Sequence, residues 1–391
     1  MVYFDNAATS LPKPPAVGQA IAEALSAFGG AGRGGHPAAI NASRCVYQTR
    51  VALADLLGSA PERTVFTANA TESLNLAISG ILTPDDHVIT TVFEHNSVLR
   101  PLYRLRAQGM GMSVVGIDSD GNLNYEALRQ HISANTKAVI CTHASNLTGA
   151  VTDLRNIASL CKEFGLTLIV DAAQTAGVFP INADAMGIGI LCFTGHKGLY
   201  GPQGTGGLCV GAGIKIEPLM VGGSGMHSFS EIHPQHMPEA LEAGTANAHG
   251  LAGLLAGVGF IRETGMETIK KQEQKLSRQF REGINGVPGV RIYGNAAGSS
   301  GGDANGSYAP IVTLNIGDLD SGEVGDRLAN QYGICVRAGA HCAPLAHIAL
   351  GTREQGAVRF SFSYFNTEEE IHTGIRAIEE IACLARNDGW L

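Results

Sequence analysis

The chain has 391 residues, of which 27 are Lys or Arg and 35 are Asp or Glu, and its formal net charge is -8. This length is enough for one large domain and a smaller one, which excludes a small disulfide-stapled scaffold. The negative charge argues against a nucleic-acid-binding protein, because such proteins need a basic surface.

The first two thirds of the chain alternate short strand-like runs with helical patterns. Residues 16–28 have helical spacing and end in the glycine-rich sequence GGAGRGGHP. Strand-like runs such as TVFTA, DHVITTVF, KAVICTHAS and LTLIVDAAQ then alternate with helical segments. This alternation predicts an α/β fold in which helices cover both faces of a mostly parallel sheet. Such a sheet binds ligands at the carboxyl ends of its strands.

The organisation changes near residue 260. A long polar helix is predicted to about residue 285, and it is followed by strands at VRIYG and PIVTLNI, a helix over residues 321–332, strands at ICVRAG and VRFSFSYF, and a final helix. This mixture predicts a smaller α+β domain. We therefore expect a large domain over residues 16–260 and a small domain over residues 261–391, which residues 1–15 join.

The cysteines and the N-terminus bear on the compartment of the protein. The eight cysteines lie singly along the chain, several inside strand-like runs such as AVICT and ILCFT, so most are expected to be buried thiols in a reducing compartment. The sequence MVYFDNAATS has no basic segment followed by an apolar stretch, and the apolar run over residues 251–261 is too short to cross a bilayer. We expect a soluble, cytoplasmic protein with neither a membrane nor a nucleic acid as partner.

Two familiar ligand-binding motifs are not supported by their surroundings. Gly30, Gly32 and Gly35 fit GxGxxG, but a helix precedes them, so the strand that a dinucleotide-binding motif needs is missing. His341, Cys342 and His347 have neither a CxxC nor an HExxH pattern beside them. We therefore expect no metal site.

Lys197 stands in the sequence TGHKGLYGPQGTGG, shortly after the strand-like run ILCF. Poor solvation at the end of a buried strand lowers the pKa of an amine and makes it nucleophilic enough to form a Schiff base. The alternative is a surface lysine in a glycine-rich turn. The other polar residues at the ends of predicted strands decide between a Schiff-base lysine and a surface lysine.

Asp171 ends the apolar run LTLIVD, and Gln174 follows three residues later. A carboxylate in this place needs a partner, because an unpaired buried charge is costly. Asp171 is either the N-cap of a helix or an anion held against a pyridinium nitrogen, as in enzymes that use pyridoxal phosphate.

Two further strand ends carry polar residues. The sequence NATE, residues 69–72, has the pattern of a helix start whose backbone N–H groups favour a phosphate, although such starts are common in α/β proteins. His95 follows the run DHVITTVF. It either stacks on an aromatic ring or is an ordinary structural histidine.

Taken in order, these motifs resemble the class V aminotransferase family of fold type I pyridoxal-phosphate enzymes, and within it the NifS/SufS-like cysteine desulfurases and selenocysteine lyases. The resemblance spans almost the whole chain. Its nine motifs are DNAATS (5–10), NATESLN (69–75), EHNS (94–97), SNLTG (145–149), VDAAQ (170–174), TGHKGLYGPQGTG (194–206), EAGTAN (242–247), RAGAHCAP (337–344) and RFSFSYFNT (359–367).

The resemblance implies pyridoxal 5'-phosphate (PLP) as cofactor and assigns it a set of residues. Lys197 binds PLP covalently, Asp171 pairs with the pyridine nitrogen, Gln174 bonds the ring hydroxyl and His95 stacks on the ring. The residues implied for the phosphate are Ala70, Thr71, Thr194, His196 and, from the opposite subunit of a homodimer, Thr245. The residues implied for the substrate are Arg359, which clamps the carboxylate as a bidentate fork, Asn146, which also contacts the cofactor, Arg337 and Ala8.

Cys342 differs from the other cysteines because it stands in the glycine-containing loop RAGAHCAP. We expect His341 and the nearby arginines 337 and 359 to favour its thiolate. Cys342 and Arg359 are 17 positions apart (359 − 342). This is too close for the long mobile cysteine arm of the other desulfurase group, so the resemblance favours the group of SUF-type desulfurases and selenocysteine lyases, which often need a sulfur-acceptor protein.

The resemblance implies that L-cysteine is converted to L-alanine while its sulfur passes to Cys342 as a persulfide and then to an acceptor. Lys197 removes the α-proton and His95 helps to move protons. L-Selenocysteine is the alternative substrate. A transaminase, lyase or epimerase of the same family and a scaffold protein without catalysis are further hypotheses. The departures from the family pattern at Gly32, Gly198 and Ala340 leave the preferred substrate and acceptor open.

Overall fold

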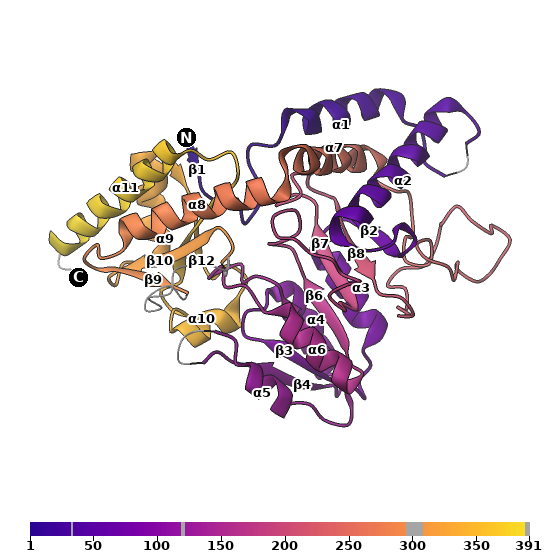
Figure 1. Ribbon diagram of the computed structural model, residues 1–391, viewed down its shortest axis with the longest axis horizontal. Helices are drawn as coiled ribbons and strands as arrows, with labels where there is room; N and C mark the ends of the chain where they lie inside the picture. The colour runs from indigo at the N-terminus through magenta and orange to yellow at the C-terminus, as the bar shows by residue number, and fades with distance from the viewer. Residues whose placement is uncertain (33, 119–121, 295–307, 388–391) are drawn as a thin grey trace.

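The computed structural model describes residues 1–32, 34–118, 122–294 and 308–387. Their helices and strands form one large and one small sheet with helices packed against both (Figure 1). The large sheet comes from the first part of the chain, and the small one from the last third. A third, two-stranded pairing joins the N-terminus to the C-terminal part.

The large sheet has seven strands in the order β2-β8-β7-β6-β5-β3-β4. Neighbouring strands are parallel except where β8 is involved, which runs antiparallel to β2 and to β7. The strands are β2 (Thr64–Thr67), β3 (His87–Thr91), β4 (Gly111–Val115), β5 (Thr136–Thr142), β6 (Thr167–Asp171), β7 (Ile190–Thr194) and β8 (Gly206–Val210). The predicted α/β fold with a mostly parallel sheet is confirmed.

Both faces of this sheet are buried, and successive residues of a strand point to opposite faces. In β5, Val139 and Cys141 join one hydrophobic cluster, whereas Ala138 and Ile140 join the other. The first face is covered by α2 (Pro37–Leu57), α5 (Tyr125–Gln130), α6 (Leu154–Phe164) and α7 (Ala248–Thr264), and the second by α3 (Ala70–Ile81) and α4 (Asn96–Arg106). Burial on both sides explains why the strands are continuous apolar runs.

The small sheet has the order β12-β13-β10-β9, and its neighbouring strands are antiparallel. Its strands are β9 (Val290–Tyr293), β10 (Ile311–Ile316), β12 (Arg337–Gly339) and β13 (Ala357–Ser361). The elements around it are α9 (Ser321–Tyr332), α10 (Pro344–Leu350) and α11 (Glu368–Asn387). Apolar side chains of this sheet, of α8 (Met266–Ile284), and of α9 and α11 form a hydrophobic cluster of their own.

The chain changes packing partners at Gly265. α7 packs against α1 (Pro15–Ala27) and α2, whereas α8 (Met266–Ile284) packs against α11. Figure 1 shows α8 extending from the end of α7 toward the small sheet. The predicted polar helix therefore begins at Met266 and not near residue 260, because Gly265 adopts a positive φ of 86° between the two helices. The division into two domains near residue 260 stays a prediction.

The first ten residues contact both parts of the molecule. β1 (Val2–Tyr3) pairs in parallel with β11 (Ile334–Cys335), and Phe4 is buried among aromatic rings of the small-sheet cluster. The chain then turns back, and the backbone N–H of Ser10 donates to the carbonyl of His196, in the loop after β7, at 3.1 Å. This segment joins the small sheet to the functional edge of the large one.

Four helices and one strand were not predicted from the sequence, namely α2, α5, α7, α10 and β8. β8 has the sequence GGLCV, in which two glycines resemble a turn, although all five residues are buried. Within the ranges that the structure describes, no helix combines the length and the apolar character that crossing a membrane requires.

Candidate active site

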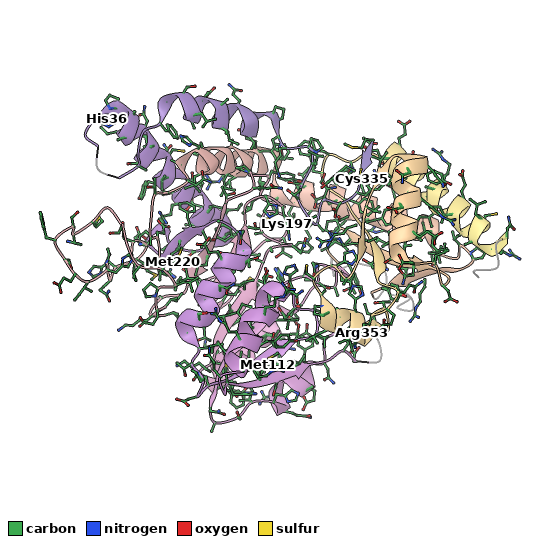
Figure 2. All side chains as sticks on the ribbon, turned by 180° about the vertical axis from the view of Figure 1, so that it is seen from behind. His36, Met112, Lys197, Met220, Cys335 and Arg353 are labelled. Carbon is green, nitrogen blue, oxygen red and sulfur yellow. The ribbon has the colours of Figure 1, made fainter. Side chains whose placement is uncertain are left out.

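Polar side chains gather where the central strands of the large sheet end. Asp171 is the last residue of β6, and Thr194 is the last residue of the adjacent β7. Lys197 follows three residues after Thr194, and Figure 2 shows it near the middle of the molecule. Because parallel strands end at the same edge of the sheet, the charges of Lys197 and Asp171 act on each other.

Lys197 is half-buried, and its loss of hydration makes the amine reactive. Loss of hydration, together with the charges of Arg359 and Arg337, lowers the pKa of Lys197 to about 8, although Asp171 opposes the shift. The backbone is fixed as well, since the Lys197 carbonyl accepts hydrogen bonds from the Ser10 hydroxyl at 3.0 Å and from the Tyr200 N–H at 2.9 Å. The surface-lysine alternative does not describe this residue.

Asp171 is a buried carboxylate without an ion-pair partner among the described residues, and 4% of its surface is exposed. Burial raises the pKa of Asp171, although an N–H from Ala173 donates to Oδ1 at 2.9 Å and Lys197 lies in its field. The residues after it form turns and not an α-helix, so the N-cap alternative is not met. A cationic ring nitrogen would provide the missing charge partner.

His95 presents a neutral imidazole to the site. It is the N-cap of α4, and its Nδ1 accepts from the Ser97 N–H at 3.0 Å and hydrogen-bonds the Ser97 hydroxyl at 2.8 Å. Burial lowers the pKa of His95 to about 4, and the positive charge of Lys197 contributes. The same Ser97 hydroxyl lies 2.8 Å from the Thr71 hydroxyl, so Ser97 links His95 to the start of α3.

The start of α3 has the features of an anion site. The Asn69 side chain accepts from the Glu72 N–H at 3.0 Å, and the Glu72 carboxylate accepts from the Ala68 N–H at 2.6 Å. These two bonds leave the N–H groups of Ala70 and Thr71 without a partner among the described residues. Free N–H groups at the positive end of a helix dipole favour a phosphate.

Two buried side-chain atoms beside the lysine also lack partners. Thr194 Oγ1 and His196 Nδ1 make no hydrogen bond among the described residues. Burial lowers the pKa of His196 to about 4, and the charges of Lys197 and Lys13 add to this. Unpaired buried polar atoms are costly, so their presence together marks a place where a polar ligand completes the structure.

The first residues of the chain border this site. The Gln174 side-chain amide donates to the Ala7 carbonyl at 3.1 Å, and the Ala8 N–H donates to the Asp5 carbonyl at 3.1 Å. Ala7 and Gln174 line one cavity with Lys197. The role of Ala8 toward the substrate stays a prediction.

Arg359 is almost completely buried on β13, with 1% of its surface exposed. Its Nη1 donates to the Asn146 carbonyl at 2.9 Å, and its Nη2 donates to Asp5 Oδ1 at 2.9 Å. Arg359 Nε and Asn146 Oδ1 have no partner among the described residues. These two atoms, a donor and an acceptor, are therefore free to bind a polar ligand.

Cys342 lies on a short loop between β12 and α10 that is tied to the large sheet. The Asn96 N–H at the start of α4 donates to the Cys342 carbonyl at 2.7 Å, and the Asn146 amide donates to the His341 carbonyl at 2.8 Å. His341 and Cys342 have φ values of 50° and 55°, in the left-handed region that non-glycine residues seldom adopt. The loop therefore holds the thiol in a fixed position.

Two of the residues expected beside the thiol, Arg337 and His341, have different surroundings. Arg337 Nη2 lies 3.8 Å from Cys342 Sγ, as a residue that favours the thiolate should. His341 is buried, and its ring stacks on His347 with 5.8 Å between centroids. Burial lowers the pKa of His341 to about 3, so His341 is neutral near neutral pH. Its part in favouring the thiolate of Cys342 stays a prediction.

A pocket of about 410 Å³ lies beside His95 and Cys342. None of the described residues that line it is acidic. The residues around it are Thr71, Asn75, His95, Asn96, Ser97, Arg100, Pro101, Arg104 and Cys342. The pocket connects the start of α3, the histidine and the thiol in a single space, which is large enough for a small molecule.

Thr245 is not joined to the site within one chain. It is exposed and lies on the segment between β8 and α7. Its role toward an opposite subunit stays a prediction. Residues that the sequence did not single out include Asp5 and Ser97, although both lie inside quoted motifs; their roles depend on partners far away in the sequence or on side-chain geometry.

Comparison with known proteins gives a consistent set of similarities. The sequence matches the family model Aminotransferase class-V over residues 2–373. A protein of Methanothermobacter thermautotrophicus named probable cysteine desulfurase is 32% identical over 97% of this chain and 94% of its own length. A cysteine desulfurase of Haloferax volcanii is 29% identical over 97% of this chain and 89% of its own length. The apo structure of a cysteine desulfurase from Thermococcus onnurineus NA1 has a TM-score of 0.89 and 33% identity, covering 98% of this chain and 94% of that one.

Proposed function

This chain belongs to the class V aminotransferase family, and on that premise we propose that it is a PLP-dependent cysteine desulfurase. The enzyme converts L-cysteine to L-alanine and takes the sulfur onto Cys342 as a persulfide. One observation carries the proposal: Cys342 lines the same pocket as His95 and Thr71, and a hydrogen bond from the Asn96 N–H to its carbonyl ties its loop to the start of α4.

The residues of the site fit PLP. Lys197 would attach the cofactor, buried Asp171 would pair with its ring nitrogen, His95 would lie on the ring and Gln174 would contact the ring hydroxyl. The phosphate would take the unpartnered groups of Ala70, Thr71, Thr194 and His196 described above. When bound, PLP supplies an electron sink that makes the α-proton of an amino acid removable.

Lys197 and His95 are suited to moving protons. With a pKa of about 8, the Lys197 amine is partly neutral near neutral pH, so it can accept the α-proton of the substrate. His95 remains neutral because its pKa is held near 4, and its Nδ1 is already bonded to Ser97. Its other ring nitrogen is then the one that can exchange a proton within the site.

Arg359 would bind the substrate carboxylate. Its guanidinium is held by Asp5 and by the Asn146 carbonyl, which fixes the plane of the fork. The free Arg359 Nε and Asn146 Oδ1 offer one donor and one acceptor to the substrate. A lysine would supply charge but no fixed plane at this place.

The sulfur-transfer step belongs to Cys342. Its thiolate, beside the Arg337 guanidinium, attacks the sulfur of the substrate. The new S–S bond forms as the Cβ–S bond breaks, and the electron pair of that bond remains with the carbon fragment, which takes up a proton and leaves as alanine. Selenocysteine can follow the same course, so selenocysteine lyase is the alternative activity.

We further propose a cytoplasmic homodimer in which Thr245 reaches the phosphate of the partner's site, and a sulfur-acceptor protein as a possible partner. Several apolar side chains between β8 and α7 are exposed, and the segment that carries Met220 projects from the body (Figure 2), which supports burial against a second copy. The eight free cysteines support a reducing compartment.

Alanine release from L-cysteine and from L-selenocysteine tests the proposal. Cys342→Ala should lower the rate with cysteine at least about 100-fold while the visible absorbance of bound PLP persists. Cys335→Ala, outside the pocket, should behave as the wild type. Lys197→Ala should lose the bound-PLP absorbance. Full activity of Cys342→Ala on cysteine would sink the desulfurase mechanism, and loss confined to cysteine would favour selenocysteine as substrate.

A further inference from the structure

Two arginines of α4 form the outer wall of the pocket that holds Cys342. Arg100 and Arg104 are one helical turn apart and both are exposed. α4 packs against α3 (Figure 1), and Arg104 Nη2 donates to the Ser79 hydroxyl on that helix at 3.0 Å. The lining of this pocket carries positive charge and no carboxylate.

Neither arginine serves an ion pair. Among the described residues, the salt bridges of the protein involve other cations, and neither Arg100 nor Arg104 has a carboxylate within 4.0 Å. Like charges at positions i and i+4 of a helix repel each other and destabilise it slightly. Two unpaired arginines side by side in a chain with net charge -8 therefore have no structural partner on α4 and are available to a ligand.

The positive charges of Arg100 and Arg104 lie in the same pocket as the Cys342 thiol. Cys342 and the two arginines line one pocket, and the Asn96 hydrogen bond ties the Cys342 carbonyl to the start of α4. The charge of Arg100 also reaches His95, whose pKa it helps to lower. An anion in this pocket therefore lies in the field of the two arginines as well as beside the sulfur.

We infer that Arg100 and Arg104 bind the anionic group of a small thiol that removes sulfur from Cys342. This inference rests on the proposed function. In the step, the acceptor thiolate attacks the outer sulfur of the Cys342 persulfide, a new S–S bond forms on the acceptor, and the bond to Sγ breaks to release the Cys342 thiolate. No other oxidant or reductant is required. The two guanidinium groups hold the carboxylate of the acceptor while its sulfur reaches the persulfide.

The size of the pocket points to a small acceptor. The pocket of about 410 Å³ also includes Thr71 and His95, which we assign to PLP, so only part of this volume is open to an acceptor. The Cys342 loop is held by Asn96 and Asn146, so the thiol stays at the pocket and an acceptor has to reach it there. An acceptor must therefore enter the pocket, where Arg100 and Arg104 favour an anionic molecule over a neutral one.

Alkylation of Cys342 tests, without any turnover, whether Arg100 and Arg104 favour an anionic reagent. Iodoacetate and iodoacetamide form the same S–C bond with a thiolate and release iodide, but only iodoacetate is anionic. We define the ratio as the rate constant for iodoacetate divided by that for iodoacetamide. It is measured at Cys342 by peptide mass spectrometry on the enzyme as purified. Exposed Cys383 on α11 supplies the reference ratio within the same molecule. At low ionic strength the ratio at Cys342 should exceed that at Cys383 by about fivefold, and added salt should reduce the difference.

Variants assign this effect to the two arginines. Arg100→Ala combined with Arg104→Ala should lower the Cys342 ratio at least about threefold, and Arg100→Lys should keep most of it, because the charge remains. Arg106→Ala is the matched control, since Arg106 is an exposed arginine of α4 that stacks on Tyr103 and does not line the pocket. An unchanged ratio in the double variant overturns the inference, as does a wild-type ratio that equals the Cys383 reference at low salt.

Persulfide discharge tests the acceptor itself. Cys342 is first loaded with L-cysteine, and discharge is followed with mercaptopropionate, which is anionic, and with neutral mercaptoethanol. Each rate is expressed as wild type over the double variant, so the intrinsic reactivity of each thiol cancels. This quotient should be about fivefold or more for mercaptopropionate and close to one for mercaptoethanol. Equal quotients overturn the inference, whereas failure of Cys342 to load at all overturns the proposed function.

Discussion

Arg359 and Asp5 form an ion pair at 2.9 Å that joins the small sheet to the first residues of the chain. The Arg359 side chain is 1% exposed and that of Asp5 is 21% exposed, so the guanidinium depends on this carboxylate for its charge balance. Arg359 also donates to the Asn146 carbonyl at 2.9 Å. The arginine that we assign to the substrate carboxylate is thus oriented by two acceptors from different parts of the fold.

Removal of the carboxylate in Asp5→Ala should lower the free energy of unfolding by about 2 to 4 kcal/mol, because the guanidinium stays buried without its partner. The KM for cysteine should rise as well, since Arg359 loses one of the contacts that orient it. Denaturant unfolding and steady-state kinetics measure the two effects. The exposed pair of Arg262 and Asp55 gives the control, and Asp55→Ala should cost less than about 1 kcal/mol. Equal losses in the two variants would contradict the prediction.

Gly198, the residue after Lys197, packs closely against the turn that follows β6. A Cβ on Gly198 would lie 2.7 Å from the Ala176 carbonyl oxygen and 2.7 Å from Val178 Cγ2. Gly198→Ala should therefore displace this turn or the lysine loop, lower the melting temperature and speed the loss of PLP on dialysis. Gly18 on α1 has nothing within 4 Å of its Cβ position, so Gly18→Ala should leave PLP retention unchanged. Normal retention in Gly198→Ala would show that the close packing has no effect on the site.

Part of this site was readable from the sequence because its residues end buried strands. Lys197, Asp171 and Thr194 follow apolar runs that alternate with helices, and the parallel sheet brings such ends to one edge. Cys342 was separable from the other cysteines by its loop sequence. The same reasoning gave the α/β fold, since it depends on local periodicity alone.

The contacts that orient these residues were beyond sequence reasoning. Asp5 pairs with a residue 354 positions away, and no local pattern marks that distance. The neutral state of His341 depends on its burial and on the nearby His347 ring, which the sequence around His341 does not indicate. For Arg100 and Arg104, helical spacing puts them on one side of α4, but only the fold places Cys342 in the same pocket.

The pKa of Lys197 predicts how cofactor uptake depends on pH. The neutral amine attacks the cofactor aldehyde, so the uptake rate of the apo-enzyme should rise with pH and level off above about pH 8. Asp171 raises this pKa, so Asp171→Asn should move the levelling to lower pH. Stopped-flow absorbance across a pH series measures the profile. Asp184→Asn, at the exposed pair with Arg63, should keep the wild-type profile. A profile in Asp171→Asn that levels at the wild-type pH would contradict this prediction.

Glu273 on α8 predicts a pH-dependent stability that is separate from the chemistry of the site. Its carboxyl is 3% exposed, and Oε1 accepts from the Tyr200 hydroxyl and from the Tyr364 N–H, both at 3.0 Å. Among the described residues it has no cation within salt-bridge distance. Burial raises its pKa from 4.5 to about 8.

The folded protein therefore keeps a proton on Glu273 between about pH 4.5 and pH 8 that the unfolded chain releases. Its contribution to stability is complete below the unfolded pKa and is lost as pH rises through the folded pKa. Glu273→Gln keeps the acceptor oxygen and removes the titration. The variant should match the wild type near about pH 4 and exceed its melting temperature progressively up to about pH 9. Glu282→Gln, an exposed site on the same helix, should show no such trend. A difference in melting temperature between the wild type and Glu273→Gln that stays constant over this pH range would contradict the prediction. It would mean that Glu273 is ionised throughout, and that the hydrogen bonds from Tyr200 and Tyr364 stabilise its charge more than burial opposes it.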